Sequence, residues 1–531
     1  MGEELLWGNG KEFFPLGLQC CNSSAYSRME MERFWQCVDR TGVNSVEIPV
    51  YWEKFEKEEG KFDYKLLEEH VDQAKQHRVK LLLVWFGTWK NGTSKFAPQW
   101  VRNQRNRFTR VISYEGIETN ILSPYCRENL EADKKAFVKL AEYAQKVNEK
   151  EADNVIIGIQ VENEPGMMMR GYRDHSQKAD IWFNGEIPEK VKTLLKTKDM
   201  GEVTDNWKKS GQLENGTWKE VFGRYAEEYF SVYGIASYIN EIAEAGKEIT
   251  SLPFSVNVWV DRVGWDEPGA DYPAGGPVSK VLGLWKALTP AIDVIGLDNY
   301  KLALSEYCMD CQGYAKYGNP LFLPETHAWE PASSRNMFWA LGKYKTQGIF
   351  FFGPEAMIDE DGHVRAKSVD VWNSLKAMTS LQSVFRRMQK ECDIQVIYQE
   401  EDAIEQRIVM DDTYIRIGFN SYERTDYHHG YFDTPCGYGK GLLIRENQRT
   451  FYAVGDSFCL SIRGNRDAVY FRQKMDKYVD YECVEEGYFD REGRWQMTRI
   501  RNGDESDYGI WVTYDCGTVK IIVGGGEYER L

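Results

Sequence analysis

The feature that most constrains this 531-residue sequence is an alternation of short apolar strands and amphipathic helices. Because the apolar stretches are nearly continuous, we expect parallel strands that are covered on both faces. Eight strands, each followed by a helix, are typical of a (β/α)8 barrel, which is an α/β fold. The predicted strands lie at residues 13–21, 44–50, 80–86, 155–164, 253–260, 291–300, 320–328 and 348–356.

A doubly wound open sheet is the competing α/β architecture. Such a sheet usually carries a glycine-rich phosphate loop after its first strand, and residues 13–24, FFPLGLQCCNSS, contain no GxGxxG. This absence favours the barrel. The predicted helices lie at residues 31–42, 64–78, 132–147, 222–246, 279–288, 336–348 and 368–385.

The pattern divides the chain into a barrel at residues 1–388 and a second domain at 389–531. A polar insertion at about residues 166–222 follows the fourth strand, and we expect it to close one end of a pocket or to contact a neighbouring subunit. The second domain shows short strands separated by Gly, Asn and Asp turns, which is typical of an all-β sandwich. Its predicted strands lie at 391–399, 403–410, 413–420, 440–447, 450–462, 468–475, 509–516 and 518–525.

Composition excludes several classes of function. The net charge of −16 gives no basic surface for nucleic acid. The chain has no apolar run long enough to span a bilayer and does not begin with a signal-like segment, so we expect no membrane partner. Eleven cysteines without a signal predict reduced thiols in a cytoplasm. Cys308 and Cys311 have CxxC spacing, but no second pair completes a zinc site, and we expect them in a turn.

Two glutamates end predicted strands where barrel enzymes place their active sites. Glu164 ends the fourth strand in VENEP, and Glu325 ends the seventh in LPETH. Two carboxyl groups that face each other across a glycosidic bond are the requirement for glycoside hydrolysis. The alternative is that each is a salt-bridged glutamate at an exposed strand end. Glu162 has the same parity as Glu164, so it is expected to face the barrel interior, where it would need a partner that the sequence does not identify.

Residues 156–166, IIGIQVENEPG, resemble the fourth-strand motif of β-galactosidases in glycoside hydrolase families 35 and 42, which are clan A barrels. Residues 41–64 also resemble the second-strand region of family 35, through Trp-x-x-x-Glu followed by Gly-x-Phe. The resemblance implies that Glu164 is the general acid/base, that Glu325 is the nucleophile, and that Asn163 hydrogen-bonds the sugar 2-hydroxyl. It further implies a retaining exo-β-galactosidase that needs no cofactor or metal.

The sequence departs from family 35 at two sugar-contacting positions. Pro49 stands where the family usually has Tyr, and the third strand is followed by no Glu. Galactose specificity therefore stays open. A β-glucosidase, a β-mannosidase and a carbohydrate-binding barrel without activity are the alternatives. In each case the expected ligand is an oligosaccharide or a small glycoside, and assembly into a homo-oligomer stays open.

Further polar and aromatic residues near strand ends are candidates for substrate binding. Tyr300 could donate a hydrogen bond to Glu325 or serve only as a rim tyrosine. Trp329 is a candidate stacking platform, and Glu47 and Glu355 are candidate orienting residues. The remaining candidates are Trp85, Trp89, Asn91, Asn257 and His327.

A metal-dependent hydrolase is the main rival from another class. Such sites need clustered histidines and carboxylates. The seven histidines form no HxH or HExxH motif, and His428 and His429 lie in the β-rich region. The sequence therefore favours a pair of glutamates over a metal centre.

Overall fold

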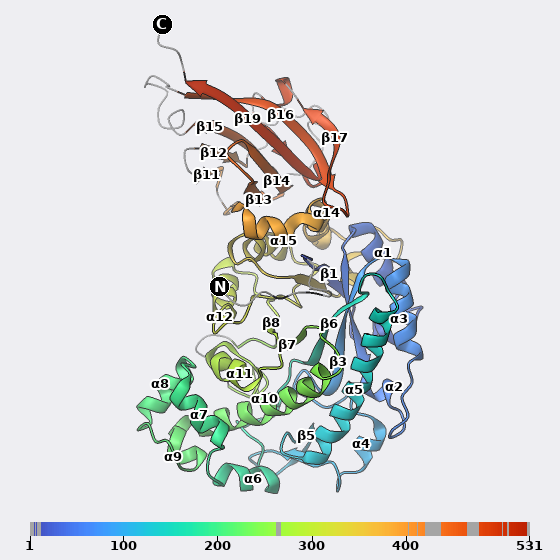
Figure 1. Cartoon of the computed structure of the whole chain (residues 1–531), viewed down its shortest axis with the longest axis vertical. Helices are drawn as coiled ribbons and strands as arrows, with labels where there is room; N and C mark the ends of the chain where they lie inside the picture. Colours follow the sequence, from blue (N-terminus) through green and yellow to red (C-terminus); the bar gives the residue numbers. More distant parts are fainter. Residues whose placement is uncertain are drawn as a thin grey trace.

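The computed structural model describes residues 5, 7, 12–261, 267–401, 403–410, 413–419, 437–464, 477–501, 503–506 and 509–527. Figure 1 shows a helix-covered barrel and, beyond α14 and α15, a group of antiparallel strands. The barrel contains a seven-stranded parallel sheet in the order β8-β7-β6-β3-β2-β1-β9. Its strands are β1 (Leu16–Gln19), β2 (Ser45–Tyr51), β3 (Lys80–Lys90), β6 (Ile156–Asn163), β7 (Phe254–Val258), β8 (Val294–Leu297) and β9 (Ile349–Phe352).

The predicted strand at residues 320–328 closes the gap between β8 and β9. It makes parallel backbone bridges on both sides, Asp298 to Glu325 on one and Leu323 to Ile349 on the other. Pro324 has no N–H to donate, which explains why this segment forms isolated bridges instead of a continuous ladder. The predicted (β/α)8 barrel is therefore confirmed.

Each barrel strand is followed by a helix that covers the outer face. The first, α1, ends at Gly42, whose φ of 77° is the left-handed conformation that commonly terminates helices. The helices are α1 (Glu32–Thr41), α3 (Lys65–Gln76), α5 (Arg127–Glu149), α10 (Ala226–Lys247), α11 (Leu282–Leu288), α12 (Leu304–Tyr314), α13 (Pro331–Phe338) and α14 (Val369–Thr379), with short helices α2 (Trp52–Phe55) and α4 (Gln99–Asn103) beside them.

Three sequence predictions differ from these helices. The Cys308/Cys311 pair lies in helix α12, which was not predicted, and not in a turn; both thiols are free. The helix predicted at 336–348 starts earlier, at Pro331, and changes to wider π-type hydrogen bonding over Trp339–Lys343. The helix predicted at 368–385 is two helices, α14 and α15 (Gln382–Glu391).

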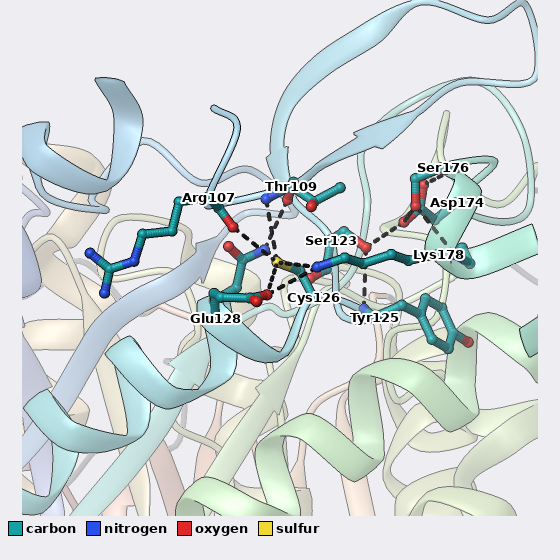
Figure 2. Close-up of polar contacts among 11 residues, drawn as sticks. Arg107, Thr109, Ser123, Tyr125, Cys126, Glu128, Asp174, Ser176 and Lys178 are labelled. Carbon is teal, nitrogen blue, oxygen red and sulfur yellow. Dashed lines mark hydrogen bonds and ion pairs between the residues drawn. The ribbon is translucent and has the colours of Figure 1, made fainter. Parts of the chain in front are cut away.

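The insertion after β6 contains four short helices and is tied to the barrel through a buried aspartate. Asp174 Oδ1 accepts the backbone N–H of Ile112 at 3.0 Å, and its Oδ2 accepts the Ser123 hydroxyl at 2.5 Å. Lys178 forms an ion pair with Glu128 at 3.0 Å on the same side (Figure 2). The helices are α6 (Gln177–Asn184), α7 (Glu189–Thr197), α8 (Glu202–Lys209) and α9 (Trp218–Phe222), and the contacted hairpin is β4 (Arg110–Ile112) with β5 (Glu118–Leu122).

The C-terminal strands form two antiparallel sheets. One has the order β10-β13-β14-β19-β16-β17 and the other β11-β12-β15-β18. The prediction at 450–462 was wrong in one respect, because the chain turns at Ser457 (φ 61°) and makes two strands. The strands are β10 (Asp393–Tyr398), β11 (Glu405–Met410), β12 (Thr413–Gly418), β13 (Lys440–Arg445), β14 (Thr450–Asp456), β15 (Phe458–Gly464), β16 (Lys477–Phe489), β17 (Trp495–Arg501), β18 (Ile510–Val512) and β19 (Thr518–Glu527).

The six-stranded sheet packs on both faces. On β13, Leu442 and Ile444 belong to the core that is continuous with the barrel, whereas Leu443 faces the core between the two sheets. This alternation is the period of two that a strand imposes. The strand predicted at 468–475 and the pair His428–His429 lie outside the described residues. Among the described residues, no helix is long and apolar enough to cross a membrane.

Candidate active site

Three carboxyl groups converge where the barrel strands end. Glu164 follows β6, Asp298 follows β8, and Glu325 lies on the segment that closes the barrel. One oxygen of each lies within 4.8 Å of one oxygen of the other two. Their exposed fractions are 7%, 1% and 5%. They line a cavity of about 430 Å³, a volume within the range of small-molecule sites.

Glu325 is held by two hydrogen-bond donors. The Tyr300 hydroxyl donates to Oε2 at 2.7 Å, and Gln19 Nε2 donates to Oε1 at 3.2 Å. Hydrogen bonds of this kind favour the ionised form of a carboxyl group. The predicted contact between Tyr300 and Glu325 is present.

Glu164 has a different environment from Glu325. Burial, followed by the nearby charge of Glu325, raises the pKa of Glu164 to about 7, although Lys90 opposes the shift. The backbone N–H of Glu164 donates to Asn257 Oδ1 at 2.6 Å, so the predicted residue Asn257 fixes the main chain of Glu164. The geometry therefore places Glu164, whose carboxyl group keeps its proton near neutral pH, beside Glu325, whose carboxyl group accepts two hydrogen bonds.

The main chain around Glu164 is strained. Glu162, Glu164 and Asn91 have φ values of 65°, 45° and 53°, in the left-handed region that residues other than glycine rarely adopt. Such conformations cluster at functional sites, because the surrounding structure must hold them in place. The left-handed turn at Glu162 also breaks the alternation of side chains along β6.

The prediction that Glu162 faces the barrel interior was therefore wrong. Its carboxylate accepts the backbone N–H groups of Thr88 at 3.0 Å and Trp89 at 2.6 Å. It also hydrogen-bonds the carboxyl group of Asp133, which is on the outer helix α5. Burial and the charge of Asp133 raise the pKa of Glu162 well above its usual range. The missing partner of Glu162 is thus another acid.

Glu162 secures a bulge in β3 that brings two residues to the cavity. Trp85 pairs with Val161, but the next pairing along the strand is Lys90 with Asn163, so β3 carries extra residues between these points. Lys90 and Asn91, at the end of the bulge, both line the cavity. With the Asn163 amide turned to satisfy its neighbours, its oxygen accepts from Lys90 Nζ at 3.0 Å.

Trp85 and Trp89, two of the predicted substrate-binding residues, do not line the cavity. Trp85 is buried and donates from Nε1 to Asp133 Oδ1 at 2.8 Å. Trp89 is also buried, and its ring packs edge-on against Tyr238 of α10 with centroids 4.8 Å apart. Both rings therefore pack in the barrel wall and not in the cavity that holds the three carboxyls.

Trp329 and Glu355 line a neighbouring cavity instead of the one that holds the three carboxyls. Glu355 Oε1 accepts the backbone N–H of Cys21 at 3.0 Å and the Ser24 hydroxyl at 2.6 Å, so it orders the loop after β1. His327 lies between the two cavities. Its ring centroid is 4.7 Å from that of Tyr300 and 5.3 Å from that of Trp329.

Glu47 is a fully buried acid on β2. Neither of its carboxyl oxygens has a hydrogen-bond partner among the described residues. Burial and the charge of Glu325 raise the pKa of Glu47 well above its usual range.

Several residues that line the cavity or contact its carboxyls were not among the predicted site residues. Asp298 ends β8 in LDNY and Gln19 ends β1, so both carried the signal of a polar residue at a strand end. Lys90 and the half-buried Trp259 also line the cavity. Lys90 follows the third predicted strand, where the sequence suggests replacements for the missing sugar contacts, whereas the sequence gives no sign of Trp259. The position of Lys90 depends on the bulge in β3, and the position of Trp259 depends on the loop after β7.

A second acidic group, Asp359, Asp361 and His363, lies on a turn. Asp359 Oδ1 accepts the backbone N–H groups of Asp361 and His363 at 3.0 and 2.8 Å, so turn formation explains the grouping. Asp361 and His363 are exposed, Asp359 is half-buried, and none of the three lines the cavity that holds the three carboxyls. The expectation that the protein needs no metal or cofactor stays a prediction.

Comparisons with known proteins agree with this geometry. Residues 21–208 match the family model described as beta-galactosidase, and residues 373–513 match a domain of unknown function. No curated protein sequence matches the chain.

Solved structures resemble the fold at low identity. The catalytic domain of beta-amylase from Paenibacillus polymyxa is 11% identical with a TM-score of 0.51, covering 68% of this chain and 98% of its own. A beta-galactosidase from Bacillus circulans sp. alkalophilus is 16% identical with a TM-score of 0.47, covering 72% and 57%. The exo-beta-1,4-mannosidase Op5Man5 from Opitutaceae bacterium strain TAV5 is 14% identical with a TM-score of 0.41, covering 69% and 60%.

The chain thus spans little more than half of the length of the Bacillus circulans structure. The match to the beta-galactosidase family model begins just after β1 and extends past β6, so it includes Glu164 and its left-handed neighbour Glu162. Over residues 21–208 the chain is therefore similar to the β-galactosidase family.

Proposed function

We propose that the protein is a retaining exo-β-glycosidase, with a terminal β-linked galactose as the first candidate substrate. Glu164 is the general acid/base and Glu325 is the nucleophile. The observation that carries the proposal is the short separation of these two carboxyls, with one oxygen of each within 4.8 Å of the other. Retaining enzymes place the two groups about 5–5.5 Å apart, whereas inverting enzymes need about 6.5–9.5 Å to admit a water molecule.

The environments of the two glutamates support this division of roles. A general acid must hold a proton at the working pH, and the pKa of Glu164 is raised to about 7. A nucleophile must be ionised, and Glu325 receives hydrogen bonds from Tyr300 and Gln19. In the first half of the reaction Glu325 attacks the anomeric carbon while Glu164 protonates the leaving oxygen. In the second half Glu164 takes a proton from the water that releases the sugar.

The cavity supports binding of one terminal sugar. Trp259, just after β7, offers an aromatic face, and Lys90 and Asn91, at the end of β3, offer polar groups. Asn163 lies directly behind the cavity, with its amide next to Lys90. Asn163 is fully buried, so contact with a sugar 2-hydroxyl stays a prediction.

The test is hydrolysis of aryl β-galactosides, β-glucosides and β-mannosides by the wild type, Glu164→Ala and Glu325→Ala, each with and without azide. Loss of the acid costs about 10²–10⁴-fold in rate. In a retaining enzyme azide restores Glu164→Ala to give a β-glycosyl azide, and Glu325→Ala to give an α-glycosyl azide.

Glu355→Gln is the matched control, because it removes a strand-end acid from the neighbouring cavity and is expected to retain activity. Cleavage of a glucoside or mannoside in place of a galactoside would preserve the roles and change the substrate. If the wild type cleaved no glycoside yet bound saccharide as well as both variants, the carbohydrate-binding alternative would replace the enzymatic one.

A further inference from the structure

Two lysines, Lys90 and Lys301, line the cavity together with the three carboxyl groups. Neither ammonium group lies within 4.0 Å of a carboxylate oxygen of any described residue. A lysine side chain is a flexible stem that ends in a charge, so a lysine that serves to neutralise a neighbouring acid can reach it. The positive and negative charges of this cavity are therefore kept apart and are not paired with one another.

Lys90 is held by contacts within the protein. It is 8% exposed, and with the Asn163 amide turned to satisfy its neighbours, Lys90 Nζ donates to the Asn163 oxygen at 3.0 Å. Lys90 Nζ also lies 5.0 Å from the centroid of the Phe86 ring, a distance at which an aromatic face attracts a cation. These contacts explain Lys90 as part of the cavity wall without any ligand.

Lys301 has a fixed main chain but an unpaired side chain. Its backbone N–H donates to Asn299 Oδ1 at 3.2 Å, and its carbonyl accepts from Asn336 Nδ2 at 3.1 Å. The half-buried side chain ends in an ammonium group that donates to no described residue. The charge of Lys301 acts on Asp310 of α12, but the two groups do not approach within 4.0 Å. The cavity thus contains one cation that the described residues leave without a partner.

An unpaired ammonium group in a small-molecule cavity favours an anionic ligand. A substrate that fills the cavity removes water from Lys301, and a donor that loses its water without gaining an acceptor costs free energy. A carboxylate or a sulfate restores the lost hydrogen bonds, and such charge-assisted bonds are roughly twice as strong as neutral ones. The chain has a net charge of −16 and therefore repels anions at long range. Recognition of an anion in this cavity thus requires a local cation, and Lys301 supplies one.

We propose that Lys301 is a specificity-determining residue and that the substrate is an anionic glycoside whose carboxylate or sulfate pairs with the Lys301 ammonium group. The inference rests on the proposed function, because it takes the cavity with the three carboxyl groups as the site of glycoside hydrolysis. The anionic group belongs either to the terminal sugar, as in a galacturonide, or to the unit to which that sugar is linked. In the second case the terminal sugar remains galactose.

The first test measures kcat/KM for two matched pairs of substrates. One pair is an aryl β-galacturonide and the aryl β-galactoside, and the other is 4-carboxyphenyl β-galactoside and its neutral methyl ester. Because the members of a pair differ in intrinsic reactivity, the readout is the change in their acidic-to-neutral ratio when Lys301 is replaced. In Lys301→Met this ratio should fall by roughly tenfold for one pair, the change expected from the loss of one charge-assisted hydrogen bond. The pair that responds identifies which unit carries the anionic group.

Two further variants control for charge and position. Lys301→Arg keeps the positive charge, so its ratio should fall less than that of Lys301→Met. Lys316→Met removes an exposed lysine that does not line the cavity and should leave the ratio as in the wild type. Cleavage of the neutral members alone, or a ratio unchanged in Lys301→Met for both pairs, would overturn the inference and leave the proposed function in place. An equal fall in Lys301→Arg and Lys301→Met would also overturn it, because charge would then not matter.

A second measurement needs no catalytic activity. If the wild type cleaved none of the four compounds, isothermal titration calorimetry would measure how tightly each of them binds. Tighter binding of the acidic member of one pair, lost in Lys301→Met, would refute the proposed function and support the anion site. Binding that is the same in the wild type and in Lys301→Met would refute both.

Discussion

The carboxyl groups of Glu162 and Asp133 hydrogen-bond each other inside the barrel wall, where neither is exposed to solvent. Together they accept the backbone N–H groups of Thr88 and Trp89 and the indole N–H of Trp85. This pair holds the β3 bulge against the strand that carries Glu164, so it links the outer helix α5 to the position of the candidate acid.

Removing Glu162 should destabilise the protein strongly. Glu162→Ala leaves the N–H of Trp89 without its acceptor and Asp133 without its carboxyl partner. Each buried hydrogen-bonding group that is left without a partner costs about 1–3 kcal/mol. Asp133→Asn is the matched variant, since its amide can still donate to Glu162, and it should cost about 1 kcal/mol. Urea unfolding curves measure both, and equal losses would contradict the pairing.

The same pair should make stability depend on pH. The pKa of Glu162 is raised above 4.5, so its contribution to stability is fully present below about pH 4.5 and is lost as the pH rises through the folded pKa. Asp133→Asn removes the negative charge that raises the pKa of Glu162. This variant should therefore weaken the dependence of stability on pH. Free energies of unfolding measured from pH 5 to pH 9 test the sign. A wild type whose Glu162 contribution grew toward pH 9 would exclude a shared proton.

The activity should fall above neutral pH. With a pKa of about 7, Glu164 loses the proton that the leaving group needs as the pH rises past that value. The basic limb of kcat/KM for aryl glycosides should therefore lie near pH 7. Substrates with good leaving groups need less protonation, so Glu164→Ala should harm them less than substrates with poor ones. Equal losses for all leaving groups would remove Glu164 from the acid role.

Tyr300 should contribute to catalysis only through its hydroxyl group. Tyr300→Phe removes the 2.7 Å hydrogen bond to Glu325, a bond to a charged group that is worth about 1.5–3 kcal/mol. We expect kcat/KM to fall by roughly 10- to 150-fold with the fold intact. Tyr307→Phe is the control, because the buried Tyr307 hydroxyl has no partner among the described residues. Similar losses in both variants would point to packing.

Trp259, and not Trp329, should act as the sugar platform. Trp259 lines the cavity with the three carboxyls, whereas Trp329 lines the neighbouring one. Trp259→Ala should raise KM by roughly tenfold, equivalent to about 1.4 kcal/mol, with a small effect on kcat. Trp329→Ala should change KM far less. Steady-state kinetics on one aryl glycoside decide between the two, and a larger effect at Trp329 would restore the sequence-based hypothesis.

The amino-acid sequence determined the architecture because its strands are apolar over their whole length. Continuous apolar runs such as IIGIQV require cover on both faces, and a repeated helix supplies it. The β16 and β17 strands escaped prediction because charged residues interrupt them, as in VEEGYF and TRIR. Glu164 and Glu325 could also be found, since an acid at the end of a buried strand stands out from the residues before it.

Tertiary structure alone decided which polar groups meet. The sequence gives Glu162 and Glu164 the same parity, yet a left-handed residue at each position sends one toward α5 and the other into the cavity. Asp298 and Lys90 reach the site through the closing of the barrel and the bulge in β3. A strand-end pattern reports local burial, whereas a pKa or a shared proton depends on groups far apart in the chain, and only the folded barrel brings these within a few ångströms.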